Sequence, residues 1–251
     1  MIVHVHALAR DESYLLPFFL RHYAKIADRV FVLDDGSTDG SREIVRDCAF
    51  AEVAPYPFAT GLDDRVLQDA LHQSIEARSA EADWVITPDI DELLYVSEDF
   101  YHPPLREMLA LALAEGVVAV TSTAYFMVAD APPKDEGQQL YESVRLGARP
   151  RRTSRRYGYD KTLIFRPGVG IRLGAGRHKT FLPDDVKAVD LGVKLLHFSH
   201  IGLAYIEAKL QRNCSRMLML SEAERTAMFD LRWSRARREF SAMLQRAACV
   251  V

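Results

Sequence analysis

The sequence predicts an α/β fold: a mostly parallel central sheet flanked by helices, with further helices at the C-terminal end. Over the first hundred residues, short β-branched runs alternate with stretches of helical periodicity. Connections this short between strands and helices favour a parallel sheet that is covered on both faces. The composition, 49% hydrophobic and 27% charged, excludes a disordered or fibrous chain.

Each element follows from its own pattern. The predicted strands are 2–8, 29–33, 51–55, 84–88, 117–129, 162–166, 169–173 and 194–200. The predicted helices are 12–27, 41–48, 63–81 and 105–115, with helical sequence again from about residue 204. Residues 130–158 have little periodicity and predict a loop. We therefore expect one domain over 1–200, with a helical appendage over 201–251 packed on it.

Charge and cysteine content narrow the class of protein. Residues 1–100 carry a net charge of −12 and residues 101–251 a net charge of +9. The cysteines, Cys48, Cys214 and Cys249, are scattered and form no CxxC motif, which argues against a disulfide framework or a cysteine-rich zinc site. No apolar run is long enough to cross a bilayer. We expect a cytoplasmic protein.

The first acidic run, Asp34 to Ser41 (DDGSTDGS), follows a hydrophobic strand. Gly36 and Gly40 permit positive φ angles, and Ser41 is suited to cap the next helix. Carboxylates at a strand end can accept hydrogen bonds from a nucleobase or from ribose hydroxyls. The alternative interpretation is a turn that is rich in turn-forming residues.

The second acidic run, Asp89-Ile90-Asp91-Glu92, follows the strand WVITP. Two carboxylates one residue apart at a strand end can face a divalent cation, and such hard oxygen ligands suit Mg²⁺ or Mn²⁺. Because ligands bind at the carboxyl edge of a parallel sheet, we expect this run to lie at the same edge as Asp34 and Asp35. The alternative interpretation is a helix N-terminus, where acidic residues complement the dipole.

Together these segments resemble family 2-type glycosyltransferases of the GT-A (Rossmann-like) fold. VFVLDDGSTDGSREIV, followed by DWVITPDIDELL, is similar to the bacterial branch whose metal motif is D-x-D-E. Arg65 and Gln68 match its R-x-x-Q, and KTLIFRP, GRHKT and LLHFSHI resemble its C-terminal half. Many relatives have Asn-Glu after the first strand, whereas this chain has Arg10-Asp11-Glu12, so a side-chain role at Arg10 is open.

The resemblance implies a nucleotide-sugar donor, most simply a UDP-sugar, and a Mn²⁺ or Mg²⁺ cofactor. Asp34 and Asp35 would contact the nucleoside, and Asp89 and Asp91 would hold the metal and the sugar diphosphate. The other residues implied for the donor are Arg65, Gln68 and Lys161.

His178, between glycines and basic residues, is the predicted third metal ligand, since a neutral imidazole can complete a site with two carboxylates. The alternative is a surface histidine in a turn. His197 and His200, on a predicted strand, are second candidates.

An inverting reaction needs a carboxylate base within reach of the acceptor hydroxyl. Asp160 and Glu92 are the predicted bases, with Asp184 and Asp185 as further candidates; a retaining reaction would need no such base. Arginines in 149–156 are suited to a diphosphate, and the equally favoured alternative interpretation is a solvated loop. We expect the acceptor to be a glycan or a lipid-linked molecule of cell-surface polysaccharide or glycoconjugate synthesis. We expect no nucleic-acid partner. The basic C-terminal helix could rest on anionic lipid of the cytoplasmic membrane. The alternative interpretation, which the sequence favours, is a helix packed on the domain with its charges in water.

Two other functions compete with glycosyl transfer. Phosphoryl transfer of the haloacid-dehalogenase type also uses D-x-D after a strand, but it requires its nucleophilic aspartate after the first strand, where this chain has ALARDES. A catalytically silent glycan-binding protein of the same fold would bind glycans equally with and without Mn²⁺.

Overall fold

The computed structural model describes residues 1–54, 56, 64–97, 103–150, 160–174, 180–215, 217 and 220–251. The strands are β1 (Val3–Ala9), β2 (Arg29–Asp34), β3 (Ala51–Ala54), β4 (Trp84–Ile86), β5 (Glu92–Tyr95), β6 (Ala119–Ala129), β7 (Leu146–Ala148), β8 (Lys161–Phe165), β9 (Arg172–Leu173), β10 (Thr180–Phe181), β11 (Val189–Ile201) and β12 (Ala248–Cys249). The helices are α1 (Leu16–Tyr23), α2 (Ser41–Arg46), α3 (Asp64–Arg78), α4 (Leu105–Ala114), α5 (Leu140–Ser143), α6 (Leu203–Ser215) and α7 (Glu222–Leu244).

The chain divides into two compact units. The first consists of Met1–Phe58, Asp64–Ala124 and Arg151–Leu196, and the second of Ala59–Asp63, Tyr125–Pro150 and His197–Val251. The C-terminal helices α6 and α7 thus belong to the second unit, together with the segment that follows β6.

The first unit contains the predicted sheet, with strand order β6-β8-β4-β1-β2-β3. Strands β4, β1, β2 and β3 are mutually parallel, and β8 runs antiparallel to both β4 and β6. The fold class, a mostly parallel sheet flanked by helices, is therefore confirmed. Because β4, β1 and β2 are parallel neighbours, their carboxyl ends open on one edge of the sheet, as expected for a ligand site.

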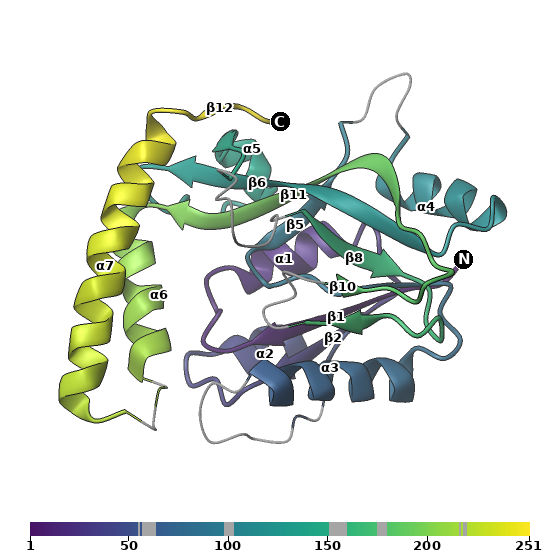
Figure 1. Ribbon diagram of the computed structural model, residues 1–251, viewed down its shortest axis with the longest axis horizontal. Coiled ribbons are helices and arrows are strands. Elements are labelled where there is room, and N and C mark those ends of the chain that lie inside the picture. The colour runs from purple at the N-terminus through teal and green to yellow at the C-terminus, as the bar shows by residue number, and fades with distance from the viewer. Residues whose placement is uncertain are drawn as a thin grey trace. The chain divides into compact units, whose positions relative to one another are not determined.

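Helices cover both faces of this sheet (Figure 1). On one face α3 packs through Leu71 and Ile75 against Phe31, Leu33 and neighbouring strand residues. On the other face the buried indole of Trp84 donates a hydrogen bond of 3.1 Å to the carbonyl of Leu109 in α4. Alternate residues of β2 and β4 thus face opposite helical layers, which explains their continuous hydrophobic sequence.

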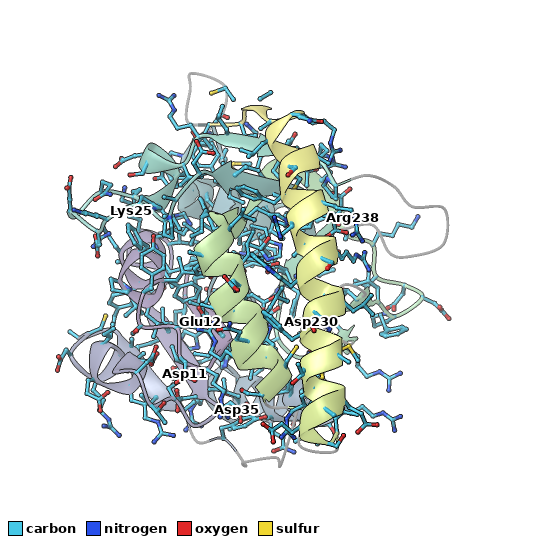
Figure 2. The ribbon with its side chains drawn as sticks, turned by 90° about the vertical axis from the view of Figure 1, so that its left-hand side faces the viewer. Asp11, Glu12, Lys25, Asp35, Asp230 and Arg238 are labelled. Atoms are coloured by element: carbon cyan, nitrogen blue, oxygen red, sulfur yellow. The ribbon has the colours of Figure 1, made fainter. Side chains whose placement is uncertain are left out.

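In the second unit, the end of β6 pairs with β7, and β7 pairs with β12, both antiparallel. Helices α6 and α7 lie side by side (Figures 1 and 2), and Figure 2 labels Asp230 and Arg238 on α7. A capping box at Ser221 and Glu224 begins α7. None of the described helices is long and apolar enough to span a membrane.

Three predictions of local structure differ from the structure. The helix expected over 12–27 forms only over Leu16–Tyr23, beginning with a proline in its first turn. The loop expected over 130–158 contains α5 and β7 within its described part. Residues 92–95 form the strand β5, so the alternative interpretation of Asp89–Glu92 as a helix N-terminus is wrong.

Candidate functional site

The loops after β1 and β2 interlock at the carboxyl edge of the sheet. The amide of Asp11 donates to Ser37 Oγ (2.8 Å), and the Asp11 carboxylate in turn accepts from the amide of Thr38 (2.7 Å). Asp11 has a φ of 50°, a left-handed conformation that is uncommon outside glycine. These reciprocal bonds fix the first loop against the DDGSTDGS run, and Figure 2 labels Asp11, Glu12 and Asp35 in this region.

Asp34 ends β2 and holds the following turn together. Its Oδ2 accepts hydrogen bonds from the amides of Gly36 and Ser37, each at 3.1 Å, and forms an ion pair with Arg42 of α2. The carboxylate is buried, and its Oδ1 has no hydrogen-bond partner among the described residues. Because buried polar atoms are normally bonded, this oxygen marks Asp34 as a place where a ligand donor can bind after a small movement.

Asp35 is bound from the first loop. Its amide donates to the carbonyl of Ala9 (2.8 Å), and Arg10 Nη1 donates to its carbonyl oxygen (2.7 Å). The same Arg10 nitrogen lies 3.9 Å from Asp35 Oδ2. The side-chain role at Arg10 that the sequence left open is thus a positioning role on Asp35.

The turn conformation confirms one prediction and corrects another. Gly36 and Gly40 have φ angles of 76° and 91°, as the sequence predicted. Ser41, however, does not cap α2: Gly40 is the N-cap residue, with no side-chain cap. The Ser41 hydroxyl instead bonds to the Asp39 carboxylate (2.6 Å) and accepts from the amide of Glu12 (2.8 Å), so it ties the two loops together.

The D-x-D-E run lies after β4, at the same edge. Since β1 separates β4 from β2, the two strands that the acidic runs follow are about 10 Å apart at an inter-strand spacing of about 4.8 Å. Asp89 is half-buried, whereas Asp91 is only 4% exposed and Glu92 is fully buried. The structure thus brings Asp34, Asp35, Asp89 and Asp91 to one edge of the sheet, as predicted from the strand pattern.

Lys161, the first residue of β8, is the cation nearest to this run in the described chain. Its Nζ donates to Glu92 Oε1 at 2.5 Å and lies 3.5 Å from Asp89 Oδ2. Glu92 Oε2 accepts from the amide of Asp89 (3.1 Å), so Glu92 is bound on both oxygens. The pair is buried, with 2% and 0% of its side chains exposed. The antiparallel pairing of β8 with β4 brings the two residues together.

The other candidate bases differ in burial. Asp160 precedes Lys161 and is exposed, and its Oδ1 accepts from the amide of Ala124 (2.9 Å). Asp184 and Asp185 are exposed in the turn after Pro183. Asp160 is therefore an accessible carboxylate directly beside the lysine that contacts the D-x-D-E run.

Of the predicted histidine ligands, the structure describes only His197 and His200. His178 and the arginines of 151–156 lie outside the described residues. His197 and His200 both belong to the second unit, where their rings lie 5.1 and 5.2 Å from the ring of Phe126. These contacts support a packing role for the two strand histidines.

The described residues fit a divalent cation through oxygen ligands alone. Asp89 and Asp91 are hard ligands of the kind that Mg²⁺ and Mn²⁺ prefer. No cluster of three or more acidic, histidine or cysteine side chains forms a metal site within the described ranges. Glu92 is already bound to Lys161. A cation held by this pair would therefore need oxygens from a ligand, such as a diphosphate, to complete its coordination.

Arg65 and Gln68 lie on α3, on the helix face that borders a pocket with the β9 and β10 strands. The sequence motifs indicated none of the other residues that line this pocket, among them His72, Arg172 and Phe181. The spacing of residues 65, 68, 69 and 72 on one helix face was a usable pattern, whereas the contribution of β9 and β10 depends on tertiary packing.

Two buried histidines support the strands that carry the site. His6 of β1 bonds through both ring nitrogens to Ser74 (3.0 Å) and Ser79 (2.7 Å), and His22 of α1 bonds through Nε2 to the carbonyl of Leu94 (2.9 Å). Burial lowers the pKa of His6 to about 3 and that of His22 to about 4. Both rings are therefore neutral at pH 7.

Comparison with known proteins adds little to this geometry. No family model matches the chain, and no curated protein matches it. Among solved structures, the chain is similar to mannosyl-3-phosphoglycerate synthase from Rubrobacter xylanophilus, with 19% identity and a TM-score of 0.34. The match covers 54% of this chain and 44% of the synthase. With a likeness this distant, the functional argument rests on the residues described above.

Proposed function

We propose that the protein is a metal-dependent glycosyltransferase that moves a sugar from a nucleotide-sugar donor to a glycan or lipid-linked acceptor. One observation carries the proposal: two acidic runs, after β2 and after β4, open on the same edge of a parallel sheet. This is the edge at which ligands bind in open α/β sheets. The two acidic runs, which carry most of the resemblance to GT-A glycosyltransferases, follow strands that end at that edge.

Asp34 and Asp35 would bind the nucleoside. Their carboxylates can accept hydrogen bonds from base N–H groups and ribose hydroxyls. Arg42 holds Asp34, and Arg10 holds the Asp35 backbone, so both carboxylates are positioned before a ligand arrives. Such preorganisation lowers the entropy that binding must offset.

Asp89 and Asp91 would hold Mn²⁺ or Mg²⁺ with the donor diphosphate, where the cation would stabilise negative charge on the leaving group. Lys161, between Glu92 and Asp89, adds a fixed positive charge at this position. We assign Glu92 to positioning Lys161 and the Asp89 backbone, because both of its oxygens are engaged and it is fully buried.

For the base we favour Asp160 over Glu92, in an inverting reaction. The acceptor hydroxyl oxygen would bond to the anomeric carbon as the bond to the diphosphate oxygen breaks. The hydroxyl proton would pass to the Asp160 carboxylate, and the nucleoside diphosphate would leave with the bonding electron pair. Asp160 is exposed and therefore open to an acceptor, unlike Glu92.

The acceptor surface would include a membrane if the acceptor is lipid-linked. Helix α7 exposes the cations Arg235, Arg237 and Arg238. Arginines near an anionic bilayer each add about 1 kcal/mol of attraction. Peripheral contact through α7 is thus our proposal for the second unit.

A thermal-shift screen tests the proposed function. UDP-, GDP-, CMP- and TDP-sugars are added with and without Mn²⁺, because a ligand that binds only the native state raises the unfolding temperature. We expect a UDP-sugar to raise the Tm only when Mn²⁺ is present. Equal Tm values with and without every donor would contradict the proposal, and hydrolysis of small phosphoesters without donor binding would favour phosphoryl transfer.

A further inference from the structure

A pocket of about 400 Å³ lies between α3 and the strands β9 and β10 of the first unit. Four of its residues, at positions 65, 68, 69 and 72, follow the spacing of one helix face. The facing side is formed by residues 172–174 and Phe181. The volume is in the range of pockets that take small molecules.

Gln68 supplies an unused hydrogen-bonding group in this pocket. Its side chain is 6% exposed, and its Oε1 has no hydrogen-bond partner among the described residues. Leaving a buried polar atom unbonded is energetically costly. A ligand hydroxyl that donates to this oxygen would recover that cost.

His72 faces the same space as a neutral ring. Its Nε2 accepts a hydrogen bond from the amide of Leu173 (3.1 Å), which places the ring proton on Nδ1. Burial lowers the pKa of His72, in keeping with the neutral form. The ring therefore adds a hydrogen-bond donor to the pocket and no charge.

The charged groups of the lining favour an anion. Arg65 and Arg172 are positive and Asp69 is negative, so the described part of the lining has a net positive charge. Guanidinium groups bind carboxylate and phosphate with two parallel hydrogen bonds. The ring of Phe181 is 44% exposed beside them, which offers an apolar surface to a sugar ring.

We propose that this pocket binds the acceptor, and that the acceptor is a sugar carrying a carboxylate or phosphate group. The anionic group would bind Arg65 and Arg172, a hydroxyl would bind Gln68, and the apolar face of the sugar would pack on Phe181. The inference rests on the proposed glycosyl transfer. The four aspartates proposed for the donor do not line this pocket. Arg65 and Gln68, which the family resemblance implied for the donor, are thus assigned to the acceptor.

Isothermal titration calorimetry on the full chain tests the inference with glucose 6-phosphate, glucuronate and neutral glucose. We expect at least one charged sugar to bind at least tenfold more tightly than glucose, and that sugar identifies the anionic group. Arg172→Ala should weaken its binding at least tenfold. The matched control is Arg46→Ala, because Arg46 is an exposed arginine of α2 with 62% of its side chain accessible; its affinity should equal that of the wild type.

Three results would overturn the inference: glucose binding as tightly as the charged sugars, an unchanged affinity in Arg172→Ala, or displacement of the charged sugar by UDP with Mn²⁺. The third would assign the pocket to the donor. UDP binding in the presence of Mn²⁺ is measured separately on the same protein. If it is normal while the charged sugars fail to bind, only the acceptor assignment is wrong; if it is absent, the proposed function itself fails.

Discussion

Lys161 and Glu92, the last residue of the D-x-D-E run, form a buried ion pair with 2.5 Å between Nζ and Oε1. The lysine begins β8 and the glutamate begins β5, so the pair joins two strands that are 69 residues apart in the sequence. The second carboxylate oxygen of Glu92, Oε2, accepts a hydrogen bond from the amide of Asp89. The position of Asp89 therefore depends on a charge pair that does not itself have to contact substrate.

Lys161→Met should lower the free energy of unfolding by about 3–5 kcal/mol, because it leaves the Glu92 carboxylate buried without its cation. Urea denaturation measures the change. The double variant Lys161→Met/Glu92→Gln removes both charges and keeps an acceptor for the Asp89 amide, so it should recover most of the loss. A single variant within 0.5 kcal/mol of wild type would show that the pair is not the anchor we describe.

Arg10→Ala should weaken UDP binding roughly tenfold, because it removes the hydrogen bond worth about 1.5 kcal/mol that holds the Asp35 backbone. The free energy of unfolding should fall by no more than the same amount, since 34% of the Arg10 side chain is exposed. Calorimetry with UDP and Mn²⁺ measures the affinity. The control is Arg29→Ala, which removes an exposed ion pair at the start of β2, the end opposite to Asp34. Equal losses of UDP affinity in both variants would refute a positioning role for Arg10.

The sequence assigns His178 to the metal. If it is a ligand, His178→Ala should shift the Mn²⁺ concentration needed for donor hydrolysis upward, since one of the protein's ligands is lost. A metal titration of hydrolysis rates measures this, with His197→Ala as the control from the second unit. Superimposable titrations of His178→Ala and wild type would remove His178 from the site.

Stability should fall as the pH drops from 6.5 towards 4. The pKa of His6 is lowered to about 3 and that of His22 to about 4, so the unfolded chain binds protons in this range and the folded chain does not. Each histidine contributes a slope of about 1.4 kcal/mol per pH unit, and the stabilisation is fully present above pH 6.5. Denaturation at several pH values measures the slope, which His22→Gln should reduce by about one proton. A flat profile would mean that the rings are protonated in the fold.

Much of the fold could be predicted because its strands are buried on both faces and its helices carry a single apolar stripe. The run WVITP predicted strand β4, and the following DIDE predicted carboxylates at the carboxyl edge of the sheet. The strand β5 could not be predicted, because an acidic start resembles a helix N-terminus and the pairing of β5 with β11 is not local.

The candidate site could be predicted only where its residues follow strands directly. Asp34, Asp35, Asp89 and Asp91 satisfy that condition. The bonds of Ser41 to the β1 loop, and the partnership of Lys161 with Glu92, arise from contacts between segments 29 and 69 residues apart. No spacing pattern within one segment encodes such contacts.

Calorimetric titration of UDP into wild type and Asp91→Asn, with and without Mn²⁺, tests whether Asp91 holds a metal ion together with the nucleotide. Asp91→Asn keeps the size of a side chain that is 4% exposed and removes its charge. We expect tight, Mn²⁺-dependent binding of UDP to wild type and loss of the Mn²⁺-dependent part of the affinity in the variant. Asp47→Asn, on the exposed end of α2, should behave as wild type. An unchanged, Mn²⁺-dependent affinity for UDP in Asp91→Asn would contradict a metal-binding role for Asp91.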